Sequence, residues 1–130
     1  MGDRVGIAEM GDGKARHAMT SHRIIRISST SREYVRVPVS ASEAGVVQNP
    51  TGDTVEFSAV TPGAEPSTWT AGTWETDATT DPDSYYARIL ISGTGGGGTL
   101  AMADGTYDLW VRITDSPERP ARPVCRLVIT

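Results

Sequence analysis

The sequence predicts an all-β domain: an immunoglobulin-like β-sandwich of about seven or eight antiparallel strands, preceded by an extended N-terminal arm. Two observations carry this prediction. Short stretches of alternating apolar and polar residues recur along the chain, and clusters of Gly, Pro and Asp separate them. No stretch has a convincing helical period. A β-barrel made from the same strands is the alternative architecture.

Composition limits the chain to one domain and an arm. Its 130 residues, 38% of them hydrophobic, suffice for one compact core but not comfortably for two. No run approaches the roughly 18 to 20 apolar residues of a membrane span. The first residues also lack the apolar region of a secretory signal, so we expect synthesis in the cytoplasm and no membrane contact. We assign residues 1–32 to the arm and residues 33–130 to the sandwich domain.

The arm differs from the rest of the chain in charge. Residues 1–32 contain six Arg or Lys against three Asp or Glu, whereas residues 33–130 contain six against thirteen. We therefore expect the arm to be attracted to the acidic body of its own chain or of a neighbour. Residues 1–22 are typical of an extended segment, and residues 22–28 predict an additional strand at the sandwich edge.

The domain opens with two half-buried strands. Val35, Val37 and Val39 alternate with polar residues, and Pro38, which lacks an N–H group, indicates an edge strand. The same alternation returns at residues 54–60, after a turn-forming run. Further strands are expected at 68–75, 85–91, 100–103, 106–114 and 123–129.

The clearest alternation lies at residues 106–114 and predicts a central strand. Its next neighbour, at residues 123–129, buries the single cysteine, Cys125, which we interpret as a core residue that forms no intrachain disulfide. The dipeptide Asp104-Gly105 is typical of a tight hairpin and predicts one between 100–103 and 106–114. On the strand at 106–114, Tyr107, Leu109, Val111 and Ile113 face one way, and Asp108, Trp110 and Arg112 face the other.

Three tryptophans are the main large aromatic residues. Trp69 and Trp74 are five positions apart and face opposite ways, unless Ala71-Gly72 introduces a bend or bulge. We expect at least one tryptophan to pack between the sheets. Trp110 lies on the polar side of its strand and is the best candidate for contact with a partner.

No catalytic or nucleotide-binding constellation emerges, so we expect no enzymatic activity and no cofactor. The only histidines, His17 and His22, lie in the arm without a nucleophile placed by a known signature. Gly93, Gly95 and Gly98 match G-x-G-x-x-G, but a short strand follows where a dinucleotide site needs a helix. A loop between strands is the better interpretation.

An acidic loop is the one candidate for a metal. Asp77, Asp81 and Asp83 could offer oxygen ligands to Ca²⁺, but their spacing does not match a calcium-binding loop, and no bidentate glutamate follows. We interpret this segment as a solvated acidic turn and expect no metal.

The candidate partner-binding residues are Arg16, Arg23, Arg26 and Arg32 of the arm, together with Trp110. Nucleic acid is a weak alternative for these arginines, because the chain as a whole has a net charge of −4 and a pI near 5.1. We therefore expect the partners to be proteins.

Residues 34–130 resemble, in their layout, small immunoglobulin-like accessory structural proteins of tailed bacteriophages, particularly those of actinobacterial hosts. The segments that carry the resemblance are EYVRVPVSA at 33–41, TGDTVEFSAV at 51–60, STWTAGTWET at 67–76, YYARILI at 85–91 and DGTYDLWVRITDSPERPARPVCRLVIT at 104–130.

This resemblance implies a non-enzymatic virion protein, either a capsid decoration protein or an accessory head or tail protein. Its partners would be other virion subunits, in a symmetric assembly or homo-oligomer. The alternative is a carbohydrate- or host-surface-binding module of a tail or baseplate, in which Trp110, Trp74 and Tyr86 stack on sugar rings.

Overall fold

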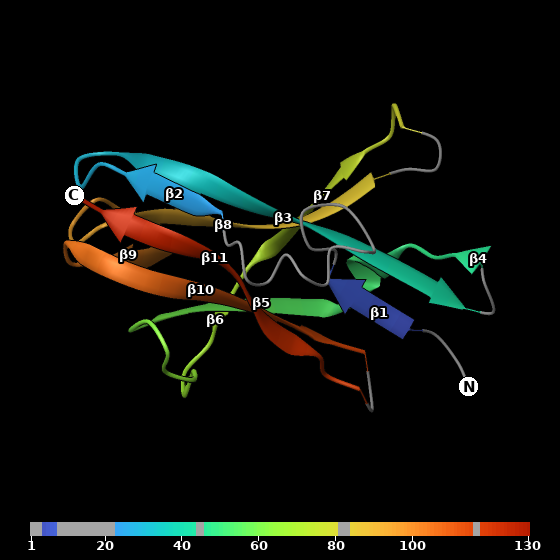
Figure 1. Ribbon diagram of the computed structural model, residues 1–130. Helices are drawn as coiled ribbons and strands as arrows, with labels where there is room; N and C mark the ends of the chain where they lie inside the picture. The colour runs from blue at the N-terminus through green and yellow to red at the C-terminus, as the bar shows by residue number, and fades with distance from the viewer. Residues whose placement is uncertain (1–3, 8–22, 44–45, 81–83, 116–117) are drawn as a thin grey trace.

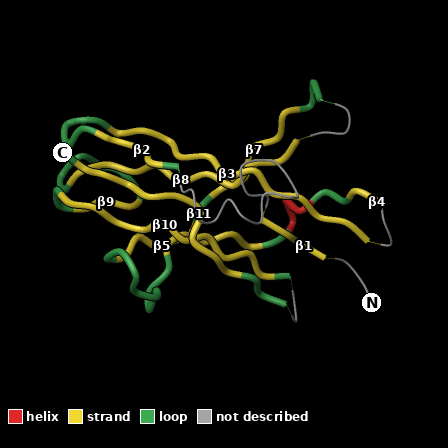
Figure 2. Tube along the Cα trace, in the orientation of Figure 1, coloured by secondary structure: helices red, strands yellow, loops and turns green. Residues whose placement is uncertain are grey.

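The computed structural model describes residues 4–7, 23–43, 46–80, 84–115 and 118–130, and these form two β-sheets packed face to face (Figure 1). Strands make up most of the trace, and a short 3-10 helix, η2 (Pro50–Gly52), precedes β5 (Figure 2). Sheet A has the strand order β1 (Arg4–Ile7), β3 (Arg32–Glu43), β8 (Ser84–Gly93) and β7 (Thr73–Asp77), with β4 (Val46–Val47) paired to β3 and β9 (Leu100–Met102) paired to β8. Sheet B has the order β2 (Ile24–Ile27), β11 (Ala121–Ile129), β10 (Gly105–Thr114), β5 (Thr54–Val60) and β6 (Thr70–Ala71).

The strand order confirms the predicted immunoglobulin-like sandwich. In this fold one sheet contains the first, second, fifth and fourth main strands, and the other contains the third, sixth and seventh. Here the first, second, fifth and fourth main strands correspond to β1, β3, β8 and β7, and the third, sixth and seventh correspond to β5, β10 and β11. Two pairings, β2 with β11 and β8 with β9, are parallel, whereas the other named strand pairs are antiparallel.

The core lies between the sheets and follows from alternation along the strands. Every second residue of β3, β5, β8, β10 and β11 points inward, and these residues are apolar. Burying this surface is the main stabilising contribution in a chain with one cysteine. The fully buried large side chains are Phe57, Ile27, Ile89, Ile91, Leu109, Ile113, Leu127, Ile129 and Val111.

Several strand predictions are confirmed. β10 is central, between β11 and β5, and Cys125 of β11 is buried. β3 pairs with β1 only from Val39 onward. Within the described residues, the part of β3 before Val39, which ends at Pro38, is therefore an edge of sheet A. Residues 24–27 of the expected arm form β2, the edge strand of sheet B, and Ile27 is fully buried.

The prediction of one strand at 68–75 is wrong, because the chain changes sheets at Gly72. β6 pairs with β5 in sheet B, whereas β7 pairs with β8 in sheet A. A Cβ atom at Gly72 would lie 2.5 Å from Cε1 of Phe57 and 2.8 Å from the carbonyl oxygen of Arg88. Only glycine fits at this crossing without displacing its neighbours. The crossing is the bend at Ala71-Gly72 that the sequence analysis allowed between Trp69 and Trp74.

The predicted hairpin at Asp104-Gly105 is also wrong. β9 belongs to sheet A and β10 to sheet B, so the dipeptide forms a corner between the sheets. The hydroxyl of Tyr107 donates a hydrogen bond of 2.8 Å to the carbonyl oxygen of Ala103. This contact corresponds to the tyrosine corner of immunoglobulin-like domains, in which a tyrosine at the start of the sixth strand fastens the preceding turn.

Candidate binding surfaces

The structure does not gather the predicted arginines into one site. Arg16 lies outside the described residues. Arg23 precedes β2, and its Nη2 atom lies 3.5 Å from the carbonyl oxygen of Arg36, which is long for a hydrogen bond. Arg26 is exposed on β2 in sheet B, whereas Arg32 is exposed at the start of β3 in sheet A.

The first surface of interest is the edge of sheet A. β1 pairs with residues 39–42 of β3, from Ile7 opposite Val39 to Arg4 opposite Ser42. Between Arg32 and Pro38, no strand in the described part of the chain pairs with β3 on this side. Such an edge offers backbone N–H and C=O groups to an added strand. In Figure 1, β1 lies toward one end of the molecule and β2 toward the other, beside the C-terminus.

The outer face of sheet B carries Trp110 between matched ion pairs. Arg112 donates two hydrogen bonds to Oε1 of Glu56, at 3.0 and 2.6 Å, and its guanidinium lies 4.4 Å from the ring centre of Trp69. Arg126 likewise donates two hydrogen bonds of 3.2 Å to Oδ1 of Asp108. Each of these two arginines therefore has a carboxylate of its own.

Trp110 lies on the polar face of β10, as expected, but it is half-buried. Its Nε1 atom is buried and has no hydrogen-bond partner among the residues that the structure describes. A buried donor that lacks a partner carries a desolvation cost.

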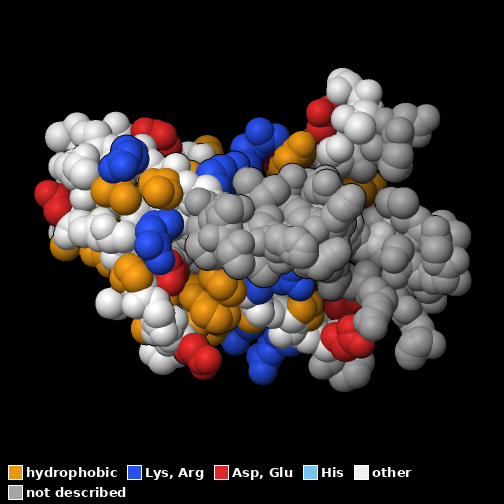
Figure 3. All heavy atoms as spheres, in the orientation of Figure 1, with side chains coloured by type: hydrophobic (Ala, Val, Ile, Leu, Met, Phe, Trp, Pro, Cys, Tyr) orange, Lys and Arg blue, Asp and Glu red, His pale blue; other side chains and the backbone are white. Residues whose placement is uncertain are grey.

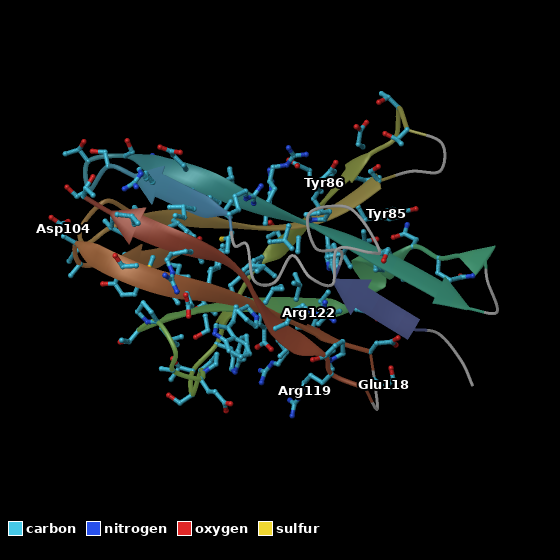
Figure 4. The ribbon with its side chains drawn as sticks, viewed as in Figure 1. Tyr85, Tyr86, Asp104, Glu118, Arg119 and Arg122 are labelled. Carbon is cyan, nitrogen blue, oxygen red and sulfur yellow. The ribbon has the colours of Figure 1, made fainter. Side chains whose placement is uncertain are left out.

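The outer face of sheet A carries a cluster that we call the Tyr–Arg ladder: Tyr34, Arg36, Glu75, Tyr86 and Arg88. Arg36 of β3 pairs in register with Arg88 of β8. The guanidinium of Arg36 lies 4.2 Å from the ring centre of Tyr86, and that of Arg88 lies 4.2 Å from the ring centre of Tyr34. Figure 4 places Tyr86 beside β7, the strand that carries Glu75.

Glu75 holds both arginines of the ladder. Nε of Arg36 donates to Oε1 of Glu75, and Nη1 of Arg88 donates to Oε2 at 3.0 Å. Nε of Arg88 also contacts Oγ1 of Thr73 at 3.3 Å. One carboxylate thus serves two guanidinium groups, unlike the one-to-one pairs on sheet B.

The ladder is accessible to a partner. Tyr34 is 51% exposed and is one of the two most exposed large hydrophobic residues of the described chain. The side chain of Arg36 is 49% exposed and that of Arg88 is 30% exposed. Over the described part of the face seen in Figure 3, hydrophobic, basic and acidic side chains are interspersed, without one large apolar patch.

The sequence analysis did not select the ladder, although the sequence contains a signal for it. The pattern Tyr-x-Arg occurs at 34–36 and again at 86–88. When two such strands pair antiparallel with the arginines opposite, each arginine has the other strand's tyrosine as its diagonal neighbour. The sequence alone does not give the register of β3 with β8, which makes these residues neighbours.

The glycine loop does not form a phosphate cradle. The N–H group of Gly98 donates to Oγ of the fully buried Ser92 at 3.0 Å, and that of Gly96 donates to the carbonyl oxygen of Gly93 at 3.0 Å. Backbone donors that would have to face a pyrophosphate are instead used within the loop.

The described residues of the acidic loop form a turn after Asp77. The carboxylate of Asp77 accepts hydrogen bonds from the Oγ1 and N–H groups of Thr79, at 2.6 and 3.0 Å, and these bonds lower its pKa. Asp81 and Asp83 lie outside the described residues. Within the residues that the structure describes, no group of three His, Cys, Asp or Glu side chains could hold a metal ion.

The aromatic residues considered for sugar stacking do not share a surface. Trp74 packs against the core, and its Nε1 atom donates to the carbonyl oxygen of Asp53 at 2.8 Å. Trp110 lies on the outer face of sheet B and Tyr86 on the outer face of sheet A. Trp74 is thus a tryptophan packed between the sheets, as the sequence led us to expect.

Comparisons with known proteins give no match: no family model, no curated protein and no solved structure is significantly similar to this chain. In the described part of the chain, no helix has the length and apolar character needed to cross a bilayer.

Proposed function

We propose that this chain is a non-enzymatic structural protein of a phage virion, which binds neighbouring virion subunits through its N-terminal arm and a sheet edge. The role is that of a capsid decoration protein or an accessory head or tail protein. The resemblance of residues 34–130 to such proteins in layout supports the proposal, as does the immunoglobulin-like sandwich itself.

The observation that carries the proposal is the way the N-terminal strand attaches. β1 is four residues long, and within the described residues it pairs only with β3. A strand held by one ladder at a sheet edge can pair equally well with the same edge of a neighbouring copy. The positive charge of residues 1–32 attracts the negatively charged residues 33–130 of a neighbouring copy as it does those of its own chain, which supports such an exchange.

A truncation tests this proposal in phage particles, and the structure dictates where it must end. Because Ile27 is fully buried, a deletion that includes β2 would remove part of the core. A deletion of residues 1–22 spares β2 and should leave a folded domain that no longer enters particles. Incorporation of this variant at the normal copy number would overturn the proposal.

A point variant of β1 gives a sharper test with a matched control. Gly6 pairs in register with Ser40 of β3, and a proline at this position would remove a backbone N–H group and fix φ. We expect Gly6→Pro to reduce incorporation strongly and Gly6→Ala to leave it near normal. Equal incorporation of the two variants would exclude strand pairing by β1 as the mode of binding.

Nothing in the described residues favours the carbohydrate-binding alternative, because Trp74 packs against the core, whereas Trp110 and Tyr86 lie on the outer faces of different sheets.

A further inference from the structure

We propose that the Tyr–Arg ladder is a second binding surface, which docks an acidic segment of a partner protein through a carboxylate held by Arg36 and Arg88. This surface lies on the outer face of sheet A, separate from the β3 edge that β1 occupies. The proposal holds whether or not the chain belongs to a virion.

The first argument is the charge imbalance. On sheet B, Arg112 and Arg126 each have their own carboxylate. On sheet A, Arg36 and Arg88 share the carboxylate of Glu75, so the five ladder residues carry one positive charge in excess. Asp77 at the end of β7 also attracts Arg36, but its carboxylate accepts hydrogen bonds from Thr79 and forms no ion pair with Arg36 within the described residues. Like charges directly opposite each other on a sheet are unfavourable, and a second carboxylate would relieve this repulsion.

The second argument is the supply of hydrogen-bond donors. A guanidinium group has five N–H donors in a planar fork that suits a carboxylate. Arg36 uses Nε for Glu75, and Arg88 uses Nη1 for Glu75 and Nε for Thr73. The structure gives neither guanidinium another hydrogen bond to the described residues, so donors on both remain for a ligand.

The third argument is preorganisation. Each guanidinium lies over a tyrosine ring at 4.2 Å and is tied to Glu75, so both are already held in place. A partner that binds here need not pay the full cost of ordering two long side chains. Tyrosine and arginine are also among the residue types that are enriched at the energetically dominant positions of protein interfaces.

The overall charge indicates which anion fits. Residues 33–130 carry six basic against thirteen acidic residues, so a long polyanion such as nucleic acid would meet repulsion beyond the ladder. A short acidic segment needs only the one or two charges that the ladder supplies. The surface therefore favours a protein carboxylate over a phosphate backbone.

The test measures binding of a short synthetic peptide with two adjacent glutamates to the full chain by isothermal titration calorimetry at low salt. Arg88→Gln should weaken binding by about tenfold or more, because a charge-assisted hydrogen bond is lost. Arg126→Gln, on sheet B, is the matched control and should bind like the unmodified chain. The basic N-terminal residues contribute the same background to all variants.

Glu75→Gln separates this proposal from a purely structural role for the ladder. It removes the internal carboxylate that competes with the ligand, so binding should become about tenfold tighter although the fold loses two ion pairs. The tyrosine rings still hold both guanidinium groups in this variant. Weaker or unchanged binding by this variant would overturn the proposal, as would equal losses in Arg88→Gln and Arg126→Gln. Preferential binding of a single-stranded oligonucleotide over the two-glutamate peptide would assign the surface to nucleic acid and overturn it as well.

Discussion

Arg36 of β3 and Arg88 of β8 lie directly opposite each other in sheet A, and the carboxylate of Glu75 binds both. Two arginines in this position repel each other, so the energetic contribution of each depends on Glu75. The tyrosine rings add favourable cation–π contacts at 4.2 Å. The three charged residues should behave as one coupled unit.

A double-mutant cycle tests this coupling. Alone, Arg88→Gln should lower the free energy of unfolding by about 1 kcal/mol, because it removes a bond to Glu75 and a stacking contact. In a Glu75→Gln background, the same change should be neutral or stabilising, because it then relieves repulsion from Arg36. Urea unfolding measures both effects. An equal loss in the two backgrounds would show that Glu75 and Arg88 act independently.

Replacement of two tryptophans by phenylalanine should give opposite results. Trp74→Phe loses the hydrogen bond to the carbonyl oxygen of Asp53 and should cost about 1 kcal/mol of unfolding free energy. Trp110→Phe removes a buried N–H group that has no partner among the described residues, so it should be neutral or stabilising by up to about 1 kcal/mol. Chemical unfolding of both variants provides the measurement. A similar destabilisation in both would mean that Nε1 of Trp110 has a partner in solution.

The crossing between the sheets makes Gly72 intolerant of a side chain. A Cβ atom there would lie within 3 Å of the Phe57 ring and the Arg88 carbonyl oxygen, so Gly72→Ala should cost about 2–3 kcal/mol. Gly52→Ala is the control, because no atom lies within 4 Å of its added Cβ. Thermal unfolding of the two variants should differ clearly. Equal melting temperatures would indicate that the crossing relaxes to accept a methyl group.

The parts of the fold that the sequence predicted are those set by local alternation. The inward positions of β10 follow from a two-residue period, and the same period places Cys125 in the core. The crossing at Gly72 was not predictable in this way, because it depends on Phe57, which a different strand brings into contact. The separation of β9 and β10 into two sheets likewise depends on partners distant in the sequence.

The candidate site was harder to predict for the same reason. Arg36 and Arg88 are far apart in the chain, and only the register of β3 with β8 makes them neighbours. Trp110 was placed correctly on the polar face of its strand, but alternation along one strand says nothing about what covers that face. Periodicity gives the direction of a side chain, whereas its contacts depend on strand pairing.

Burial of Cys125 should make the stability of the domain depend on pH in the alkaline range. Burial raises the pKa of this thiol from 9.0 to about 11, mainly through desolvation of the thiolate. Between these values the unfolded chain loses the proton while the folded chain keeps it. The contribution of this thiol to the free energy of unfolding is therefore fully present below about pH 9. It is lost as the pH rises toward 11, at up to about 1.4 kcal/mol per pH unit.

Other groups also titrate in this range, so the measurement compares the unmodified chain with Cys125→Ala. The variant should be less stable at neutral pH because of the lost packing, but it should lose less stability than the unmodified chain between pH 9 and 11. Parallel stability curves would show that the thiol ionises equally well in the folded state. Alkylation by iodoacetamide gives a second readout, since the buried thiol should react only after unfolding.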